Sequence, residues 1–483
     1  MIGIYFKIFL SLFLALIYFN LFRLVRDTVL FSFYPYLVFT VVIVAGLLIG
    51  LYFVDSVVIT RVLSWAIGIL IIFTLFSLVQ VYRNIGPRDY QVQLKEVEKG
   101  INNRADSRIV ELISSTIGSA LTSDNKVDLI VDSEKMFEEM LKKIAEAEDY
   151  IHIQFYIVRD DWLGQRFKEL LADKAAQGVE VKLIYDALGS HQLTRDYVQD
   201  LEEAGVEIES SGGIFYSLLT GKLNHRNHRK ALLVDGEVGF IGDINLGQEY
   251  TKGSPRKSLL LKLKGANLVK LQEVFLADWN SITGQQLSVT EYSIQEQVDT
   301  SLPVQLVASN YDTAWQEISK LYLGLISKAE ESIYLTTPYF IPDQSLLTAL
   351  QVASLQGVDV RIIISEQTDS QILSWSNRAF FGEVLRAGIE LYKYEDGFLH
   401  SKTLVIDEQK FSLGSANFNT RSLYLDAELN AVVYDRELAE TLTVELEDII
   451  DDSEEVLLAD YLENRSWLKR LQELIGYFLT PVT

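Results

Sequence analysis

The sequence predicts an α/β protein made of two similar halves about a pseudo-two-fold axis, preceded by N-terminal transmembrane helices. Three observations lead to this prediction. Apolar residues are concentrated in residues 1–82, strands alternate with amphipathic helices from residue 125 onward, and the same order of elements recurs after residue 302. Such alternation is typical of α/β domains with a mainly parallel sheet.

The N-terminal region contains three long apolar stretches, at residues 2–22, 36–54 and 62–82, in which Lys7 is the only charged residue. Each is close to the ~20 apolar residues that a membrane-spanning helix requires. The first stretch could instead be a cleaved signal peptide, but it lacks a small-residue cleavage site and further apolar stretches follow it. We therefore expect two to three transmembrane helices within residues 1–82.

Basic residues near these stretches predict their orientation, because short loops rich in lysine and arginine stay in the cytoplasm. The first loop and the segment after the third stretch are basic, whereas the second loop carries one acid and one base. We expect a multi-pass protein of the cell membrane whose main domain faces the cytoplasm, joined by a charged linker at residues 83–124. The basic residues are Arg23, Arg26, Arg83, Arg88 and Lys95.

The first half is expected at residues 125–282. Helical spacing of apolar residues predicts helices over 135–148 and 162–177, and apolar runs predict strands over 150–158 and 179–186. Gly178 follows the second helix and is expected to cap it.

The second half is expected at residues 302–483, after a polar segment. A strand at 332–341, a helix at 343–356 capped by Gly357, and a strand at 358–365 repeat the earlier order. Even the junctions agree, since "QGVEVKLI" in the first half matches "QGVDVRII" in the second. We interpret this as an internal duplication.

The chain ends in an amphipathic helix, expected at residues 465–479. Its apolar face either packs against the domain or lies on the bilayer with Lys469 and Arg470 at the lipid headgroups.

A short motif occurs once in each half with identical spacing. It consists of a histidine, a lysine two residues later and an aspartate seven residues after the histidine, followed by a glycine and, three residues on, an asparagine. One copy would be a weak signal, but two copies in corresponding halves are a strong one. The residues are His228, Lys230, Asp235, Gly242 and Asn245, then His400, Lys402, Asp407, Gly414 and Asn417.

These paired motifs resemble those of the phospholipase D superfamily. The stretches "NHRNHRKALLVDG", "TTPYFIPD", "SNRAFFGEVLRAGIELYKYEDGFLHSK" and "GSANFNTRSLYLDAELN" are similar to bacterial cardiolipin synthases in particular. The resemblance covers residues 125–483. It implies a phosphodiester substrate, no metal and no cofactor.

Alternation along a strand places His228 and Lys230 on one side, and likewise His400 and Lys402. Packing the halves face to face would bring both pairs into one cleft. Two ammonium groups can neutralise a phosphate and the charge of its transition state. One imidazole can then attack phosphorus while the other protonates the departing alcohol.

The motif aspartates allow two interpretations. Asp235 and Asp407 lie an odd number of residues from their histidines, so in a regular strand they would face away from the cleft. We interpret them as turn residues, pairing with a neighbouring base, and Asp235 with Gly236 as a hairpin turn. The resemblance counts them as part of the catalytic motif.

The glycine-containing stretches are expected to bind phosphate. "GSAN" offers a backbone N–H, the Ser415 hydroxyl and the Asn417 amide, and the resemblance implies this role for them and for Asn245. The first copy, "GDIN", departs from the pattern. Asp243 would repel phosphate, so we expect it to point elsewhere or to hold a lysine.

A carboxylate on the far ring nitrogen would orient each histidine. The resemblance implies Glu428 for this role, and we expect it behind His400. The resemblance also implies an aspartate for this role in the first half, but Ser258 or a neighbour stands at that place, and Glu249 is a candidate substitute. Spacing does not tell which histidine is the nucleophile.

The remaining histidines and several aromatic residues have plainer interpretations. We expect a buried structural role for His152 and a loop position for His191. For His225 two interpretations stand equally, an exposed basic surface position and contact with a lipid headgroup. Tyr156, Tyr339 and Phe340 are expected in the core.

Composition limits the function further. The chain has no cysteine, which excludes disulfides, thiolate metal sites and a cysteine nucleophile. Its net charge of −23 argues against a nucleic-acid partner. No oligomeric state follows from the sequence.

The sequence therefore predicts a cardiolipin synthase that acts on phosphatidylglycerol and membrane lipids. It would transfer a phosphatidyl group from one phosphatidylglycerol to another through a phosphohistidine and release glycerol. The alternatives are a phospholipase D-type hydrolase, another phosphatidyltransferase, or an inactive lipid-binding homologue. Asp243 and the missing carboxylate near Ser258 motivate the last of these.

Overall fold

The computed structural model describes residues 110–111, 113–114, 119–212, 225–251, 256–310 and 316–480. The expected membrane spans, and most of the expected linker, lie outside these residues. Within the described part of the chain, no helix combines the length and the apolar character needed to cross a membrane.

The first half is built on a seven-stranded sheet in the order β1-β9-β7-β6-β2-β3-β4. The β2, β3 and β4 strands are parallel to one another, whereas the pairings that join β1, β9, β7, β6 and β2 are antiparallel. The expectation of a mainly parallel sheet is therefore wrong, because the chain returns through a tight β6–β7 hairpin and then through β9. The strands are β1 (Asn125–Ile130), β2 (Tyr150–Phe155), β3 (Glu180–Asp186), β4 (Glu207–Ser211), β6 (Ala231–Val234), β7 (Val238–Gly242) and β9 (Leu260–Gly265).

The second half repeats this strand order in a second sheet, β10-β17-β16-β15-β11-β12-β13, with the short β18 added at its edge. Strand for strand, the two sheets correspond, so the internal duplication inferred from sequence is present in the fold. The strands are β10 (Val304–Ser309), β11 (Ser332–Thr337), β12 (Asp359–Ser365), β13 (Glu390–Tyr394), β15 (Thr403–Ile406), β16 (Lys410–Gly414), β17 (Asp426–Val433) and β18 (Ser453–Glu455).

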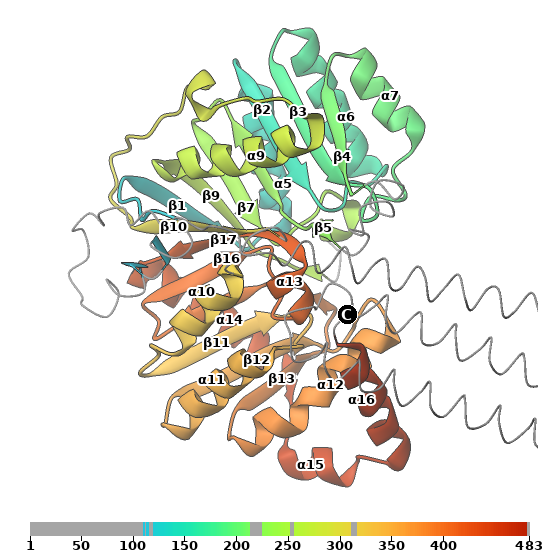
Figure 1. Ribbon diagram of the computed structural model, residues 1–483, viewed down its shortest axis with the longest axis vertical. Helices are drawn as coiled ribbons and strands as arrows, with labels where there is room; N and C mark the ends of the chain where they lie inside the picture. Colours follow the sequence, from blue (N-terminus) through green and yellow to red (C-terminus); the bar gives the residue numbers. More distant parts are fainter. Residues whose placement is uncertain are drawn as a thin grey trace, which may run out of the picture. The chain divides into compact units, whose positions relative to one another are not determined.

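Helices flank both sheets (Figure 1). Those expected over 135–148, 162–177 and 343–356 are present with small shifts at their ends, and Gly178 and Gly357 follow two of them with φ of 94° and 97°, as caps require. The helices are α5 (Ser133–Glu146), α6 (Trp162–Ala176), α7 (Arg195–Glu203), α9 (Asn267–Thr283), α10 (Glu317–Ile326), α11 (Gln344–Leu355), α12 (Gln371–Arg386), α13 (Thr420–Tyr424), α14 (Arg436–Asp451), α15 (Leu458–Glu463) and α16 (Trp467–Leu479), with short 3-10 helices at Gln248–Tyr250 and Val289–Glu291.

The two halves share an apolar core. One buried cluster contains Leu233 and Leu261 of the first sheet together with Val405 and Leu413 of the second. Each half also has a cluster of its own between its sheet and its outer helices. Burial of the inner faces of both sheets in one cluster fixes the halves against each other.

Two short strands cross between the halves and define where the site lies. The β5 strand (Arg226–Asn227), just before the first motif, pairs in parallel with the start of β17. The β14 strand (Phe398–Leu399), just before the second motif, pairs in parallel with β8 (Arg256–Lys257) of the first half. Each histidine–lysine motif is therefore held by a segment of the opposite half.

The C-terminal helix α16 packs against the domain by one face, where Ser376 Oγ on α12 donates a hydrogen bond to the Gly476 carbonyl at 3.0 Å. Its other face is exposed and apolar. The exposed residues on it are Trp467, Leu468, Leu471, Leu474, Ile475, Tyr477 and Phe478. Packing against the domain thus leaves enough apolar surface for a second contact.

Candidate active site

The two motif histidines occupy equivalent positions at the junction of the halves. His228 N–H donates to the Ala427 carbonyl at 2.9 Å, and His400 N–H donates to the Lys257 carbonyl at 2.8 Å. Both histidines directly follow the cross-half strands, outside any regular strand. The expected strand alternation therefore does not apply to them, and the interlocking of the halves places them instead.

Each motif lysine is buried and tied to its own histidine. Lys230 Nζ donates to the His228 carbonyl, and Lys402 Nζ donates to the His400 carbonyl at 2.6 Å. Burial lowers the pKa of Lys230 to about 7, and it lowers the pKa of Lys402 as well. An anionic ligand beside these ammonium groups would favour their charged forms.

The two pairs belong to one site. Burial is the main reason that the pKa of His400 lies well below its ordinary value, and the charges of Lys402 and Arg256 add to this effect. Lys230 and His228, from the other half, lower it further. The duplicated motifs are therefore within electrostatic reach of one another, as the proposed chemistry needs.

Glu428 orients His228, not His400. Its Oε1 and Oε2 atoms lie 3.0 and 3.1 Å from His228 Nδ1, and its side chain is fully buried. The expectation that Glu428 stands behind His400 is wrong, because β17 begins beside β5 of the opposite half. Order along the chain gives no sign of this crossing.

This contact fixes the state of His228. Burial lowers the pKa of His228 to about 4, so the imidazole is neutral near pH 7. Burial also raises the pKa of Glu428, but His228, Lys230 and the Ser415 hydroxyl together bring it below its ordinary value. An ionised carboxylate at Nδ1 requires the ring proton to be there, which leaves Nε2 with a free lone pair.

The "GSAN" donors are already engaged within the protein. Ser415 Oγ donates to Glu428 and accepts from Leu429 N–H at 2.9 Å. The backbone N–H groups of Ser415, Ala416 and Asn417 donate to protein acceptors as well. The expectation that these donors are free for phosphate is therefore wrong for Ser415 and for the backbone.

Asn417 and Asn245 differ in whether their side chains retain a polar atom that a ligand could contact. Among the described residues, the buried Oδ1 atom of Asn417 has no hydrogen-bond partner. Asn245 accepts from Ile157 N–H at 3.2 Å and donates to Tyr250 Oη at 2.7 Å. Asn245 thus holds a loop and a tyrosine in place, whereas Asn417 retains a polar atom in the site.

The motif aspartates hold turns at the ends of β6 and β15, whereas the motif histidines precede these strands. Asp235, with φ of 51°, accepts from the backbone N–H groups of Glu148, Asp149 and Tyr150 at 2.8–2.9 Å. Asp407, with φ of 53°, accepts from Glu330, Glu331 and Ser332 in the same way. The interpretation as turn residues is confirmed, but their partners are backbone amides and not a base, and the geometry gives them no catalytic contact.

The carboxylate expected behind His400 is absent among the described residues. His400 Nδ1 is buried there without a hydrogen-bond partner. Glu249 accepts from Arg159 Nε at 3.2 Å, so the suggestion that it replaces the missing carboxylate is wrong. Asp243 is fully buried, and its charge is the largest influence that supports the protonated form of Lys402. No ion pair of Asp243 with a lysine is present among the described residues, and its carboxylate accepts from Leu259 N–H at 3.1 Å.

Two tyrosines complete the walls of the site. The Tyr156 ring meets His228 edge-on at 4.7 Å and lies 5.2 Å from Lys230 Nζ. The Tyr250 ring meets His400 edge-on at 5.3 Å. The expectation that Tyr156 is only a core residue is therefore wrong. Its position directly after the end of β2 was the available signal.

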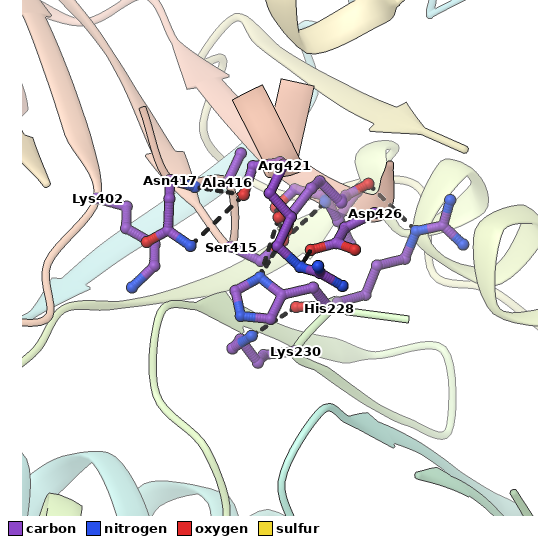
Figure 2. Close-up of polar contacts among 12 residues, drawn as sticks. His228, Lys230, Lys402, Ser415, Ala416, Asn417, Arg421 and Asp426 are labelled. Atoms are coloured by element: carbon purple, nitrogen blue, oxygen red, sulfur yellow. Dashed lines mark hydrogen bonds and ion pairs between the residues drawn. The ribbon is translucent and has the colours of Figure 1, made fainter. Parts of the chain in front are cut away.

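Two arginines near the motif histidines were not predicted from the sequence. The Arg256 guanidinium lies 4.4 Å from the centre of the Phe398 ring and adds positive charge beside His400. On the side of His228, Arg421 forms a 3.0 Å ion pair with the buried Asp426 (Figure 2). Both belong to segments next to the cross-half strands, which no sequence pattern marks as adjacent.

The other histidines lie away from this chemistry. His152 is buried and contacts Gln272 and Glu180, as its structural interpretation predicted. His225 Nδ1 lies 2.9 Å from the Leu425 carbonyl and so helps join the halves. His191 is in a loop.

Comparison with known proteins agrees with this architecture. The family model described as "Cardiolipin synthase, PLD-like domain" matches residues 140–279 and 322–450, one segment in each half. "Cardiolipin synthase 2" of Bacillus cereus is 34% identical over 404 residues, which cover 82% of this chain and 77% of that protein. "Major cardiolipin synthase ClsA" of Bacillus subtilis is 34% identical, covering 81% and 83%. "Cardiolipin synthase" of Geobacillus kaustophilus is 37% identical, covering 73% and 72%.

Among solved structures, the phosphatidylserine synthase of Haemophilus influenzae shares the fold. It superposes with a TM-score of 0.59 at 15% identity and covers 79% of this chain and all of that one. Together with the duplicated motifs and the family model, these relatives establish that the chain belongs to the cardiolipin synthase family of the phospholipase D superfamily.

Proposed function

We propose that the protein is a cardiolipin synthase, a phosphatidyltransferase that joins two phosphatidylglycerol molecules and releases glycerol. The names of its relatives support this assignment. The observation that carries it is the Glu428–His228 contact, since it prepares a neutral imidazole as a nucleophile beside two buried ammonium groups and a second histidine.

In the first step, His228 Nε2 attacks the phosphorus of one phosphatidylglycerol. A phosphorus–nitrogen bond forms and the bond to the glycerol oxygen breaks, while His400, whose protonated form the bound anionic phosphodiester favours against the effect of burial, gives its proton to that oxygen. The imidazole of His228 becomes positively charged, and Glu428 stabilises that charge. Lys230 and Lys402 neutralise the charge that gathers on the phosphate oxygens.

In the second step, His400 is neutral and takes the proton of a hydroxyl on a second phosphatidylglycerol. That oxygen attacks phosphorus, the bond to His228 breaks, and His228 is again neutral. The products are cardiolipin and a protonated His400, which is ready for the next first step. No metal or cofactor enters either step.

Product analysis tests this function against its alternatives. Purified protein in mixed micelles would receive phosphatidylglycerol labelled in its headgroup and in its acyl chains. Cardiolipin with released glycerol is expected. Phosphatidic acid as the main product would instead identify a hydrolase, and absence of turnover would identify an inactive lipid-binding homologue. His228→Ala and His400→Ala should each abolish product, so wild-type rates in either variant would contradict the two-histidine scheme.

The proposed location is the cytoplasmic face of the cell membrane. The apolar stretches within residues 1–82 are the proposed anchor, with the basic loops inside. The exposed apolar face of α16 is the proposed contact of the catalytic domain with the bilayer, supported by Lys469 and Arg470 in its first turn, which suit anionic headgroups. Protease added outside intact cells should leave the catalytic domain uncut. Cleavage of the catalytic domain by that protease would overturn the proposed orientation.

A further inference from the structure

Asp243 and Ser415 occupy equivalent places in the two halves and make the same backbone contacts. Asp243 N–H donates to the Leu259 carbonyl at 3.3 Å, as Ser415 N–H donates to the Leu429 carbonyl at 3.0 Å. In return, Leu259 N–H donates to Asp243 Oδ1 at 3.1 Å, and Leu429 N–H donates to Ser415 Oγ at 2.9 Å. The Asp243 carboxylate therefore lies where the second half has the Ser415 hydroxyl.

Ser258 and Glu428 are equivalent as well. Each follows the residue whose carbonyl accepts the backbone N–H of a motif histidine, Lys257 for His400 and Ala427 for His228. The second half thus has a hydroxyl at the first place and an acid at the second, joined by the hydrogen bond from Ser415 to Glu428. The first half has the acid at the first place and the hydroxyl at the second. The two groups have exchanged positions.

The exchange leaves two buried polar atoms without a partner in the described part of the chain. His400 Nδ1 and Ser258 Oγ are both buried, and neither has a hydrogen-bond partner of ordinary geometry among the described residues. The Ser258 hydroxyl is nevertheless close enough to the Asp243 carboxylate to stabilise its ionised form, against burial, which raises the pKa of Asp243. Asp243, Ser258 and His400 therefore form an interrupted chain of polar groups.

The length of the interruption follows from the side chains. Serine lacks the two outer carbon atoms of glutamate, so a hydroxyl at the place equivalent to Glu428 would stop short of the imidazole by about the width of one water molecule. A water in this gap would have the histidine nitrogen, the serine hydroxyl and the carboxylate as partners, which is the number that a buried water usually has. Leaving a buried polar group without a hydrogen bond costs free energy of folding, and this favours a water molecule between the two groups.

We infer that Asp243 and Ser258 together do for His400 what Glu428 does for His228, with Ser258 and one bridging water linking the Asp243 carboxylate to His400 Nδ1. This inference rests on the proposed function, because His400 is the acid of the first step. Asp243 acts through other groups and is a positioning residue. An indirect link stabilises the imidazolium less than direct contact does, which suits a residue that must release its proton.

Leaving-group dependence tests the inference. Asp243→Asn should lower kcat for cardiolipin formation by about 10- to 100-fold with little change in KM, because His400 loses support for its protonated form. The same variant should lose much less rate in the first-turnover burst of nitrophenolate from a phosphatidyl p-nitrophenol ester, since that leaving group needs no proton, and the loss that remains there reports the weaker support of protonated Lys402. The falling, basic limb of the pH–rate profile for phosphatidylglycerol should also move to lower pH.

A rescue variant separates this role from a structural one. The double variant D243S/S258E rebuilds in the first half the arrangement of the second and should recover most of the lost rate, whereas D243S alone should not. Equal losses with both substrates, or wild-type rates with both, would overturn the inference. If wild type released nitrophenolate but made phosphatidic acid instead of cardiolipin, the proposed function would fail while the leaving-group comparison still decided the role of Asp243.

Discussion

His228 Nδ1 lies 3.0 Å from Glu428 Oε1, although 200 residues separate the two in the chain. The histidine proposed as the nucleophile, in the first half, is therefore oriented by a carboxylate of the second. This contact and the unequal support of the two histidines give rise to the following predictions.

Glu428→Gln should impair the first step whatever the leaving group. The amide cannot stabilise the imidazolium that forms when His228 attacks, so the nitrophenolate burst should slow by about 100-fold or more. Rapid mixing measures this rate. Ser415→Ala keeps the carboxylate and removes one hydrogen bond to it, so its loss should be smaller. An unchanged burst in Glu428→Gln would show that His228 needs no such support.

The burst should persist to low pH. His228 must be neutral to attack, and burial holds its pKa at about 4, below the ordinary value of 6.5. The kcat/KM of the burst with the nitrophenyl ester should therefore stay level as pH falls from 7 to 5, provided the protein remains folded. A decline centred near pH 6.5 would indicate that the imidazole is not desolvated as described.

Lys230→Met should stabilise the fold and abolish catalysis. Burial holds the pKa of Lys230 at about 7, against an ordinary value of 10.5, so the unfolded chain binds the proton more tightly than the folded one does. The loss of folding stability caused by burying the charged Lys230 is fully present below pH 7, and it disappears as pH rises toward 10.5. The melting temperature at pH 7 should rise on the order of 5 °C, and the gain should shrink at higher pH. A lower melting temperature at pH 7 would contradict this account.

Asp235→Asn should destabilise the protein without the catalytic defect of His228→Ala. Asparagine tolerates the left-handed backbone of position 235, but its amide replaces one acceptor oxygen with a donor that faces a backbone N–H group. The expected loss is about 1–3 kcal/mol in the free energy of unfolding. Denaturant unfolding in detergent measures it, and the activity per folded molecule shows whether the aspartate also serves the chemistry.

The outer face of α16 should enter the bilayer. The chain has no cysteine, so Leu471→Cys gives a single site for an environment-sensitive dye. In anionic vesicles its emission should shift to the blue and respond to lipid-attached quenchers. The matched control is Leu355→Cys, since Leu355 is 73% exposed at the end of α11, and its dye should remain in water. Identical behaviour of the two dyes would remove α16 from the membrane contact.

Much of this architecture could be predicted from the sequence. The duplicated strands and helices follow from local periodicity and from glycine caps, which depend only on neighbouring residues. The paired motifs identify His228, Lys230, His400 and Lys402 because equal spacing in two halves is visible along the chain. The turn role of Asp235 also follows, since an Asp-Gly pair directly after an apolar run is typical of a hairpin turn.

The remaining features depend on how the halves interlock, and no local pattern encodes that. The partner of Glu428 is set by pairing of β5 with β17, which joins residues about 200 positions apart. The mixed sheet results from a hairpin that the apolar runs alone do not distinguish from a parallel crossover. The Ser415 hydroxyl is not free for a ligand, because Glu428 on the next strand accepts a hydrogen bond from it.

The crossing of β5 and β14 into opposite halves means that neither half could assemble a working histidine alone. A half-length ancestor would have needed a second copy of itself, and both copies would then have carried the same residue at every equivalent position. Because both halves lie in one polypeptide, that constraint is absent here. Position 243 is acidic while its counterpart at 415 carries a hydroxyl, so the two histidines can have different roles.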